Sequence, residues 1–447
     1  MTSPDSTRRR FLKTSAATLL GAPFVTSGAK AAPASQKLRH LAFGAGSMSW
    51  VDIIAFSTHP NWELAAVCDV DTRTFAQVKE KFPNVRTYVD WREALEKEAG
   101  QVDSVHISTP DHMHAAIGMA AISKGLHVYG QKPLTQNLAE CRTLTRFAHE
   151  KGIVTQMGIQ ISSSFGERFT VEMIHRGDIG KVKEVHSFSN KKWGDMDPVP
   201  IARAASPPTE LDWDKWLGVS AERPFIPDYY HPSNWRKRRD FGTGTLGDMG
   251  CHMFSGWYRA LSLTMPLSVT SLGPPPPNAE NWANDGKVEY IYPGTIHTAD
   301  KTVKVTWYDG DQLPPKEVLA LLGDIPWPDQ GSLYIGTDGV LLHQHGSTPK
   351  LLPREKFQGI RPPKLEARNH WYEFVDCCLA GGSNRKPSAN FDYAGPLTEA
   401  VLLGCLASIF PKQTLEWNAE KMLFTNSAEA TKFVKRRYRP GWEIPGL

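Results

Sequence analysis

Residues 38–49 read Leu-Arg-His-Leu-Ala-Phe-Gly-Ala-Gly-Ser-Met-Ser, an apolar run followed at once by a glycine-rich turn. The apolar run predicts a strand, and the residues after the turn predict a helix. Gly44 permits a tight turn, and Gly46 lets the backbone approach a pyrophosphate, which the free amides of the helix N-terminus stabilise. The stretch therefore predicts a nucleotide-binding unit, although Ser49 stands where a third glycine is typical. A glycine-rich turn without a ligand is the alternative.

An acidic residue follows the next predicted strand, which spans Leu64–Cys68. Asp69 lies 23 residues after Gly46, close to the ~20 residues expected for the acid that holds the ribose hydroxyls. A carboxylate here repels a 2′-phosphate, so the sequence predicts NAD rather than NADP. Asp71 and Arg73 lie close by and keep NADP open as the alternative.

Strands and helices continue to alternate up to about residue 151. Further strands are predicted at 102–107 and 126–129, and further helices at 73–82, 114–124 and 138–151. This alternation is typical of a parallel, doubly wound Rossmann sheet, in which ligands bind beyond the carboxyl ends of the strands.

The residues at these strand ends are the candidate cofactor contacts. Lys132 stands just before Pro133 at the end of a predicted strand, which favours a place in the crevice over that of a solvated loop lysine. We expect the cofactor to contact Gly44, Gly46, Ser47, Met48, Asp69, Ser108, Thr109, Pro110, His112, His114, Gln131, Lys132 and Gln160.

The pattern changes after about residue 156, where a second domain is expected. Strands are predicted at 182–189, 301–307, 331–335 and 339–342, with hairpin-type turns at Asp309-Gly310 and Asp338-Gly339. Helices at 369–380 and 396–409 are expected to pack back on the first domain. The predicted fold class is therefore α/β, with a Rossmann domain over 37–156 and an α+β domain over 157–447 that has an open, mainly antiparallel sheet.

A second glycine-rich stretch, residues 240–252, ends in Asp248-Met-Gly-Cys-His252. On a helix, Asp248 and His252 share one face because they are four residues apart. The pair suits a general base and a carboxylate that orients it, and we expect Lys132, Asp248 and His252 to be catalytic. A metal site is the alternative, but no third ligand is evident, so no metal is predicted. The other alternative is a capping aspartate and a core histidine.

Aromatic residues cluster just upstream of this stretch, at Trp213, Trp216, Tyr229, Tyr230, His231 and Trp235. Aromatic faces interleaved with polar groups suit a sugar, although core packing is the alternative. We interpret the basic run 236–239 as a solvated loop from which Arg236 reaches the site. The candidate substrate contacts are Lys132, Tyr230, Trp235, Arg236, Asp248 and His252.

The formal net charge of +4 in 447 residues has a local origin. Residues 1–31 carry five basic and one acidic residue, and the remainder is balanced, which argues against a nucleic-acid partner. Arg8-Arg9-x-Phe11-Leu12-Lys13, a modest apolar stretch at 16–25 and Ala29-Lys30-Ala31 together predict a twin-arginine signal peptide and a periplasmic protein. A solvated basic tail and a retained tether remain the alternatives. No apolar run reaches the ~18 residues of a membrane span.

Several separate motifs resemble those of the Gfo/Idh/MocA oxidoreductases, named for glucose–fructose oxidoreductase and inositol dehydrogenase. The resemblance extends from about residue 37 to the end, and the sequence is similar to the exported bacterial branch of the family. It implies that Lys132 touches substrate and nicotinamide, that Asp248 binds substrate and that His252 is catalytic. The family glutamate before the lysine is Gln131 here. The motifs are Gly44-x-Gly46, Asp69, Thr109-Pro110-Asp111-His112-x-His114, Lys132-Pro133 and Asp248-x-x-x-His252.

The resemblance implies an NAD(P)-dependent oxidoreductase that acts on a CH–OH group of a saccharide or polyol, and a homo-oligomer. Twin-arginine export moves folded proteins, so the cofactor is expected to travel tightly bound and to be restored within each catalytic cycle. One alternative is a redox-neutral glycosidase that works by oxidation, elimination and hydration. Another is a sugar-binding protein that uses the nucleotide only structurally.

Overall fold

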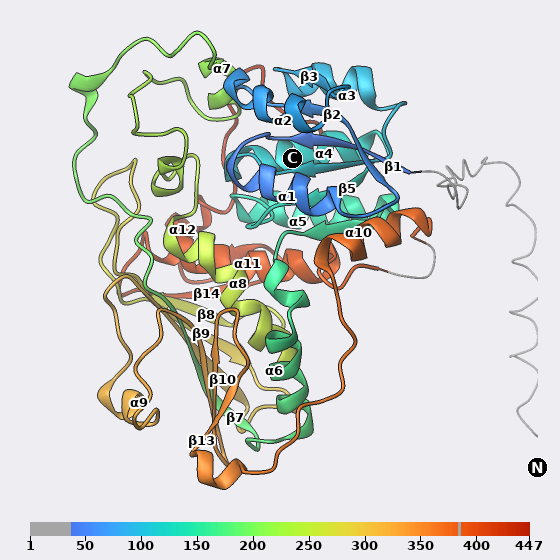
Figure 1. The fold of residues 1–447 in the computed structure, drawn as a ribbon. Coiled ribbons are helices and arrows are strands. Elements are labelled where there is room, and N and C mark those ends of the chain that lie inside the picture. Colours follow the sequence, from blue (N-terminus) through green and yellow to red (C-terminus); the bar gives the residue numbers. More distant parts are fainter. Residues whose placement is uncertain (1–36, 383–385) are drawn as a thin grey trace, which may run out of the picture. The chain divides into compact units, whose positions relative to one another are not determined.

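The computed structural model describes residues 37–382 and 386–447, which form two β-sheets with helices around them (Figure 1). The twin-arginine signal predicted at 1–31 lies outside the described residues. Among the described residues, no helix combines the length and the apolar character that a membrane span needs.

The first sheet has six parallel strands in the order β3-β2-β1-β4-β5-β6. The strands are β1 (Leu38–Phe43), β2 (Trp62–Cys68), β3 (Arg86–Tyr88), β4 (Ser104–Ile107), β5 (His127–Gly130) and β6 (Thr155–Met157). The helices of this part are α1 (Ser47–Ser57), α2 (Phe75–Lys81), α3 (Trp91–Glu98), α4 (His114–Ser123) and α5 (Leu138–Lys151). The predicted Rossmann sheet is confirmed.

The strand order reverses beside β1, because β2 lies on one side of it and β4 on the other. The apolar residues Leu41, Ala42 and Phe43 of β1 are buried, as expected for a parallel strand covered on both faces. In such a sheet, ligands bind outside the carboxyl ends of the strands at this reversal. The fold therefore places the glycine-rich turn after β1 at the expected crevice.

The second sheet has nine strands in the order β13-β12-β11-β7-β10-β9-β8-β14-β15. Only the β7–β10 pair among them is parallel, so the predicted mainly antiparallel sheet is confirmed. The strands are β7 (Val182–Ser189), β8 (Ser268–Ser271), β9 (Lys287–Pro293), β10 (Thr302–Asp309), β11 (Gln330–Gly336), β12 (Val340–Gln344), β13 (Lys350–Leu352), β14 (Thr414–Asn418) and β15 (Leu423–Phe424).

One of the two predicted hairpin turns is correct. Asp338-Gly339 joins the antiparallel pair β11 and β12. The hairpin at Asp309-Gly310 is wrong, because the chain leaves β10 there and runs out to α9 (Lys316–Ala320) before it returns as β11. The Asp309 carboxylate accepts hydrogen bonds from the Gly286 amide at 2.7 Å and the Trp307 indole at 2.8 Å, which ties the end of β10 to the start of β9.

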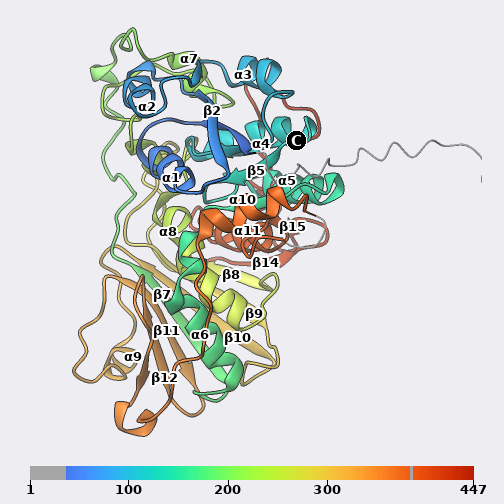
Figure 2. The same ribbon diagram turned by 45° about the vertical axis from the view of Figure 1, so that its right-hand side comes forward.

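Two late helices lie between the two sheets (Figure 2). Helix α11 (Phe391–Ala407) packs against α5 of the first sheet and against α8 (Gly244–Ala260) of the second. Helix α10 (His370–Leu379) packs against α1 and β1. The C-terminal part of the chain therefore helps to hold the nucleotide domain and the second sheet together.

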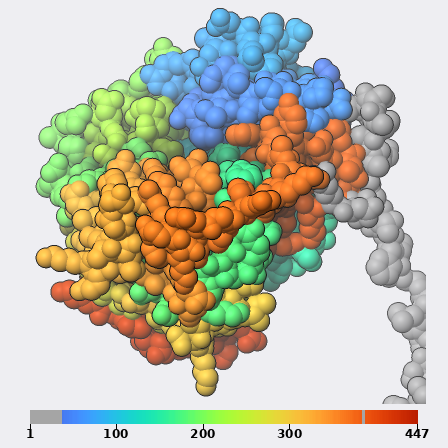
Figure 3. All heavy atoms as spheres, turned by 60° about the horizontal axis from the view of Figure 1, so that its bottom comes forward, coloured from blue at the N-terminus to red at the C-terminus, as the bar shows by residue number. Residues whose placement is uncertain are grey.

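Long connections cover the remaining surfaces. The segment between η6 (Arg354–Phe357) and α10 crosses α6 (Phe165–Arg176) on the surface (Figure 3), where Arg168 donates to the Glu366 carbonyl at 2.7 Å. The segment between β7 and α8, which includes α7 (Trp213–Leu217), reaches the nucleotide domain, where the Thr72 amide donates to the Glu210 carbonyl at 2.9 Å. The remaining short helix is α12 (Ala428–Thr431).

Candidate functional site

A cleft of about 910 Å³ opens at the carboxyl ends of β1, β4 and β5 and extends to α8 of the second domain. The fold brings most of the sequence-predicted site residues together here. Those that line the cleft are Gly44, Gly46, Ser47, Met48, Asp69, Ser108, Thr109, Pro110, His114, Gln131, Lys132, Gln160, Trp235, Arg236, Asp248 and His252.

Two predicted contacts lie outside the cleft lining. His112 is buried, and its Nε2 lies 3.1 Å from the Trp216 carbonyl oxygen. Burial lowers the pKa of His112 well below its usual value, so it is a neutral core group. Tyr230 is only 2% exposed and packs edge-on against Tyr229 and Phe241. Both side chains pack within the 191–243 segment and neither lines the cleft, so the structure gives no support to their predicted contacts with ligand, which stay predictions.

The glycine-rich turn is shaped to receive a phosphate group. Gly44 has φ +99°, and a Cβ there would lie 2.8 Å from the Ser108 carbonyl oxygen, so only glycine fits. Gly46 caps α1 without a side-chain hydrogen bond, which leaves the amides of the first helical turn directed at the cleft without a side-chain acceptor. The turn therefore fits the pyrophosphate of a dinucleotide.

Two carboxylates stand at the end of β2. Asp69 accepts one hydrogen bond on each oxygen, from the Ala45 amide at 2.8 Å and the Asp71 amide at 2.9 Å, and burial raises its pKa. Asp71 is bound by Arg73 at 2.6 Å and His231 at 2.9 Å. These partners outweigh burial and lower the pKa of Asp71. Each Asp69 oxygen keeps a lone pair for a ribose hydroxyl.

Asp248 is the centre of a buried ion cluster at the other end of the cleft. Its Oδ1 accepts from Lys132 Nζ at 2.7 Å and from Arg236 Nε at 3.1 Å, while Lys191 Nζ lies 3.6 Å from Oδ2. Lys132 also donates to the Asp248 carbonyl oxygen at 2.8 Å. Although burial opposes ionisation, Lys132, Arg236 and Lys191 hold the pKa of Asp248 far below its usual value. The carboxylate therefore stays ionised and fixes the lysine.

His252 is one helical turn from Asp248, but the two do not form the predicted pair. No hydrogen bond joins them among the described residues, and His252 Nδ1 is buried without a partner. Burial, and then the charge of Lys132, lower the pKa of His252 well below its usual value. The aspartate serves the lysine instead, and the histidine is an uncharged imidazole.

A buried carboxylate on α1 escaped the sequence interpretation. Asp52 is fully buried and accepts hydrogen bonds at 2.9 Å each from Gln131 Nε2, Ser108 Oγ and Trp371 Nε1. Burial raises the pKa of Asp52 to about 6, against these hydrogen bonds. Its only signal in the sequence is an acid among the apolar residues of the first helix. Further lining residues that were not predicted include Lys191, Trp193, Gln330 and His345.

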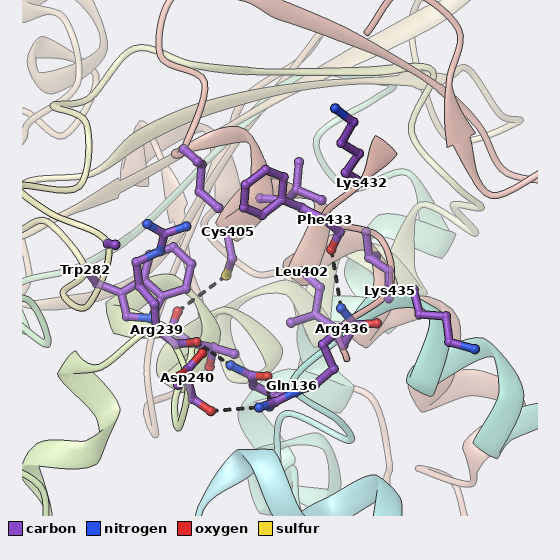
Figure 4. Close-up of a pocket in the computed structure, with 16 residues that line it drawn as sticks. Gln136, Arg239, Asp240, Trp282, Leu402, Cys405, Lys432, Phe433, Lys435 and Arg436 are labelled. Carbon is purple, nitrogen blue, oxygen red and sulfur yellow. Dashed lines mark hydrogen bonds between the residues drawn. The ribbon is translucent and has the colours of Figure 1, made fainter. Parts of the chain in front are cut away.

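Figure 4 shows a second cavity, of about 440 Å³, which shares no lining residue with the cleft. None of the predicted site residues lines it. Arg436 at its edge donates to Gln136 at 2.5 Å and to Ser220 at 3.0 Å, and Lys432 pairs with Glu429 at 2.6 Å. These basic groups therefore already have partners within the chain.

The fold and the cleft define a nucleotide-binding protein of the Rossmann class with a second α/β domain. Two sequence models of one family match the chain, "Oxidoreductase family, NAD-binding Rossmann fold" over residues 38–159 and "Oxidoreductase family, C-terminal alpha/beta domain" over 186–270. The chain belongs to this family, the Gfo/Idh/MocA oxidoreductases.

Individual relatives are distant. The chain is 24% identical to scyllo-inositol 2-dehydrogenase (NADP(+)) of Bacillus subtilis over 206 residues, and this match covers 46% of each protein. It is 29% identical over 97 residues to 2,7-anhydro-N-acetylneuraminate hydratase of Mediterraneibacter gnavus, which covers 22% of this chain and 26% of the relative. The match therefore spans less than half the length of either curated relative.

The fold is shared with solved structures over nearly the whole described chain. The aldose-aldose oxidoreductase of Caulobacter crescentus, complexed with glycerol, superposes with a TM-score of 0.56 over 86% of this chain and 100% of that one. The sequence identity is 14%, so this likeness concerns the fold.

Proposed function

We propose that the protein oxidises a CH–OH group of a saccharide or polyol, with hydride transfer to a tightly held NAD. The observation that carries the proposal is the Lys132–Asp248 ion pair beside a neutral His252, in the same cleft as the glycine-rich turn. Family membership supports an oxidoreductase and a nicotinamide cofactor.

The residues of the cleft divide the chemistry between them. A bound nicotinamide supplies the hydride acceptor. The neutral imidazole of His252 takes the hydroxyl proton, and the ammonium of Lys132 donates a hydrogen bond to the developing alkoxide. Asp248 holds Lys132 in this position through two contacts, at 2.7 and 2.8 Å. Gln131 stands in place of the family glutamate and has no carboxylate to pair with Lys132. Asp248 supplies that carboxylate instead.

We also propose that the reaction takes place in the periplasm. Arg8, Arg9 and the residues up to Ala31 form the signal that sends the folded chain to the periplasm through the twin-arginine machinery. A nucleotide loaded before export is not exchanged there, so one saccharide is oxidised and a second is reduced in each cycle.

The decisive experiment starts from mature protein purified without added nucleotide. We expect mass spectrometry to find retained NAD or NADH, and pairs of saccharides to yield one oxidised and one reduced product without added nucleotide. Absence of bound nucleotide would exclude the closed cycle. Absence of any oxidised sugar, with nucleotide bound, would exclude the oxidoreductase itself.

A redox-neutral hydrolase is the second candidate, and the similarity to a hydratase supports it. In this reaction the hydride removed in the first step returns to the product. The same protein incubated with aryl glycosides would then release free aglycone with no net change in the nicotinamide. Oxidised sugar as the end product contradicts this candidate.

The carboxylate of Asp69 predicts the choice of nucleotide. We expect the nucleotide-free protein to bind NAD⁺ at least about tenfold more tightly than NADP⁺, because an anionic 2′-phosphate meets Asp69 and Asp71. Asp69→Asn should lower the ratio of NAD⁺ affinity to NADP⁺ affinity. Asp103→Asn is the control and should leave the ratio unchanged, because the Asp103 carboxylate binds Arg39. Calorimetric titration of the three proteins provides the test, and tighter binding of NADP⁺ to the native protein contradicts the prediction.

A further inference from the structure

Positive charge exceeds negative charge at the substrate end of the cleft. Lys132, Lys191 and Arg236 surround Asp248, which lines the cleft as an ionised carboxylate. Asp111 also lines the cleft, but burial raises its pKa to about 7, and it accepts a hydrogen bond from Thr243 at 2.8 Å. It therefore balances at most part of the excess at neutral pH.

The two histidines at this end of the cleft are uncharged, so they do not change the balance of charge. Burial lowers the pKa of His252 and of His345, whose rings lie 5.7 Å apart, so both are neutral. Three cations therefore face one fully ionised carboxylate at this end of the cleft.

The guanidinium of Arg236 has free hydrogen-bond donors. Its Nε donates to Asp248, and the guanidinium carbon lies 4.3 Å from the ring centroid of Trp235 and 5.4 Å from that of Trp193. The two terminal nitrogens form no hydrogen bond with any described residue. An arginine held flat by aromatic rings is suited to bind a planar carboxylate through two parallel hydrogen bonds.

Lys191 is the second available cation. Its side chain is 41% exposed, and Nζ lies 3.6 Å from Asp248 Oδ2, too far for a hydrogen bond. The adjacent Lys192 differs, because it pairs with Asp311 at 2.5 Å and does not line the cleft. Lys191 thus keeps its donors for a ligand, whereas Lys192 is engaged on the surface.

Arg236 and Lys191 share one carboxylate with Lys132, so covering their free N–H groups with a neutral ligand costs desolvation energy that no new charge pair repays. An anion in the same position satisfies the free donors. We propose that the substrate is an anionic saccharide, a hexuronate or a sugar with a terminal uronate unit, whose carboxylate is bound by Arg236 and Lys191. Trp193 and Trp235 border the same space and suit the C–H faces of the sugar ring. This inference rests on the proposed function, since it assigns the substrate class of that same site.

The test uses nucleotide-loaded full-length mature protein and matched pairs of hexuronates and neutral hexuronamides with gluco, galacto and manno configuration. Binding is followed by calorimetry, which does not depend on turnover. For at least one configuration, we expect the uronate to bind about tenfold or more tightly than its amide. The preference should fall with added salt.

Variants locate the preference. Lys191→Met should remove most of the uronate preference and leave amide binding within about twofold, while Lys192→Met should change neither. Equal affinity for acid and amide in all three pairs, or tighter binding of a hexose 6-phosphate than of any uronate, overturns the assignment. If the uronate preference is present but no sugar is oxidised, the inference stands and the proposed oxidoreductase reaction fails.

Discussion

Lys132→Met is expected to lower kcat by about a thousandfold or more while the nucleotide remains bound. The ammonium is the proposed donor to the alkoxide, and its two contacts to Asp248 fix its position in the cleft. Methionine keeps the length and the apolar stem of the side chain. Arg236 and Lys191 remain beside Asp248, so the buried carboxylate is not left without a cation.

The measurement is a single-turnover reduction of bound nicotinamide, with nucleotide content determined on the same sample. Lys124→Met is the matched control, because Lys124 ends α4 on the surface and lies outside the cleft. His252→Ala should lower kcat by about a hundredfold or more, since it removes the proposed proton acceptor. A Lys132→Met protein that retains a tenth or more of native kcat would refute the role of the lysine.

Gln131→Glu, which introduces the glutamate of the family motif, is expected to destabilise this protein by about 3 kcal/mol or more at neutral pH. Gln131 Nε2 donates to Asp52 Oδ2 at 2.9 Å, and both side chains are buried. A glutamate would place a second carboxylate against Asp52, so that one of them must take up a proton or lie unpaired against the other. The buried carboxylate of Asp52 therefore favours an amide over a second carboxylate at position 131.

The double variant Asp52→Asn/Gln131→Glu tests this explanation. It restores one donor and one carboxylate in the same place, and we expect it to recover most of the free energy of unfolding. Gln413→Glu, on the exposed surface, is the control for adding a charge. Denaturant unfolding provides the comparison. A stable single variant, or a double variant no better than the single one, contradicts the pairing.

The pH dependence of the Gln131→Glu penalty has a definite sign. A carboxyl whose pKa is raised by burial and by a like charge binds more protons in the folded than in the unfolded protein. The single variant should therefore gain stability relative to the native protein as the pH falls from about 8 to about 5. A penalty that grows on acidification would exclude repulsion between carboxylates as its cause.

Sequence reasoning was most successful where the pattern is local and strongly periodic. Helix α5 and strand β1 occupy the residues predicted for them, because each has continuous apolar periodicity and clear ends. Strand β3 was missed because Arg86-Thr87-Tyr88 has no buried apolar face. It is an edge strand of three residues, and Arg86 and Tyr88 are held by the buried Glu98 of α3. A short polar edge strand depends on such tertiary partners.

The same distinction applies to the site. His112 and Tyr230 looked like ligand contacts, because polar and aromatic residues near a crevice serve equally well as packing groups. Both side chains are buried against the 191–243 segment, where His112 contacts Trp216 and Tyr230 contacts Phe241. The fold also decides the partner of Asp248, since Lys132, two residues after the end of β5, donates to it at 2.7 Å, whereas no hydrogen bond among the described residues joins it to His252 on the same helix.

By itself, the sequence determined the nucleotide unit, since a tight turn, a helix start and a strand depend on backbone preferences and on residues within a few positions of one another. Tertiary structure decided which charges meet. Lys132 and Asp248 are 116 residues apart, Asp52 and Gln131 are 79 apart, and Asp52 and Trp371 are 319 apart. No local rule relates such positions, because only the packing of the two domains and the late helices sets the distances on which ion pairing and burial depend.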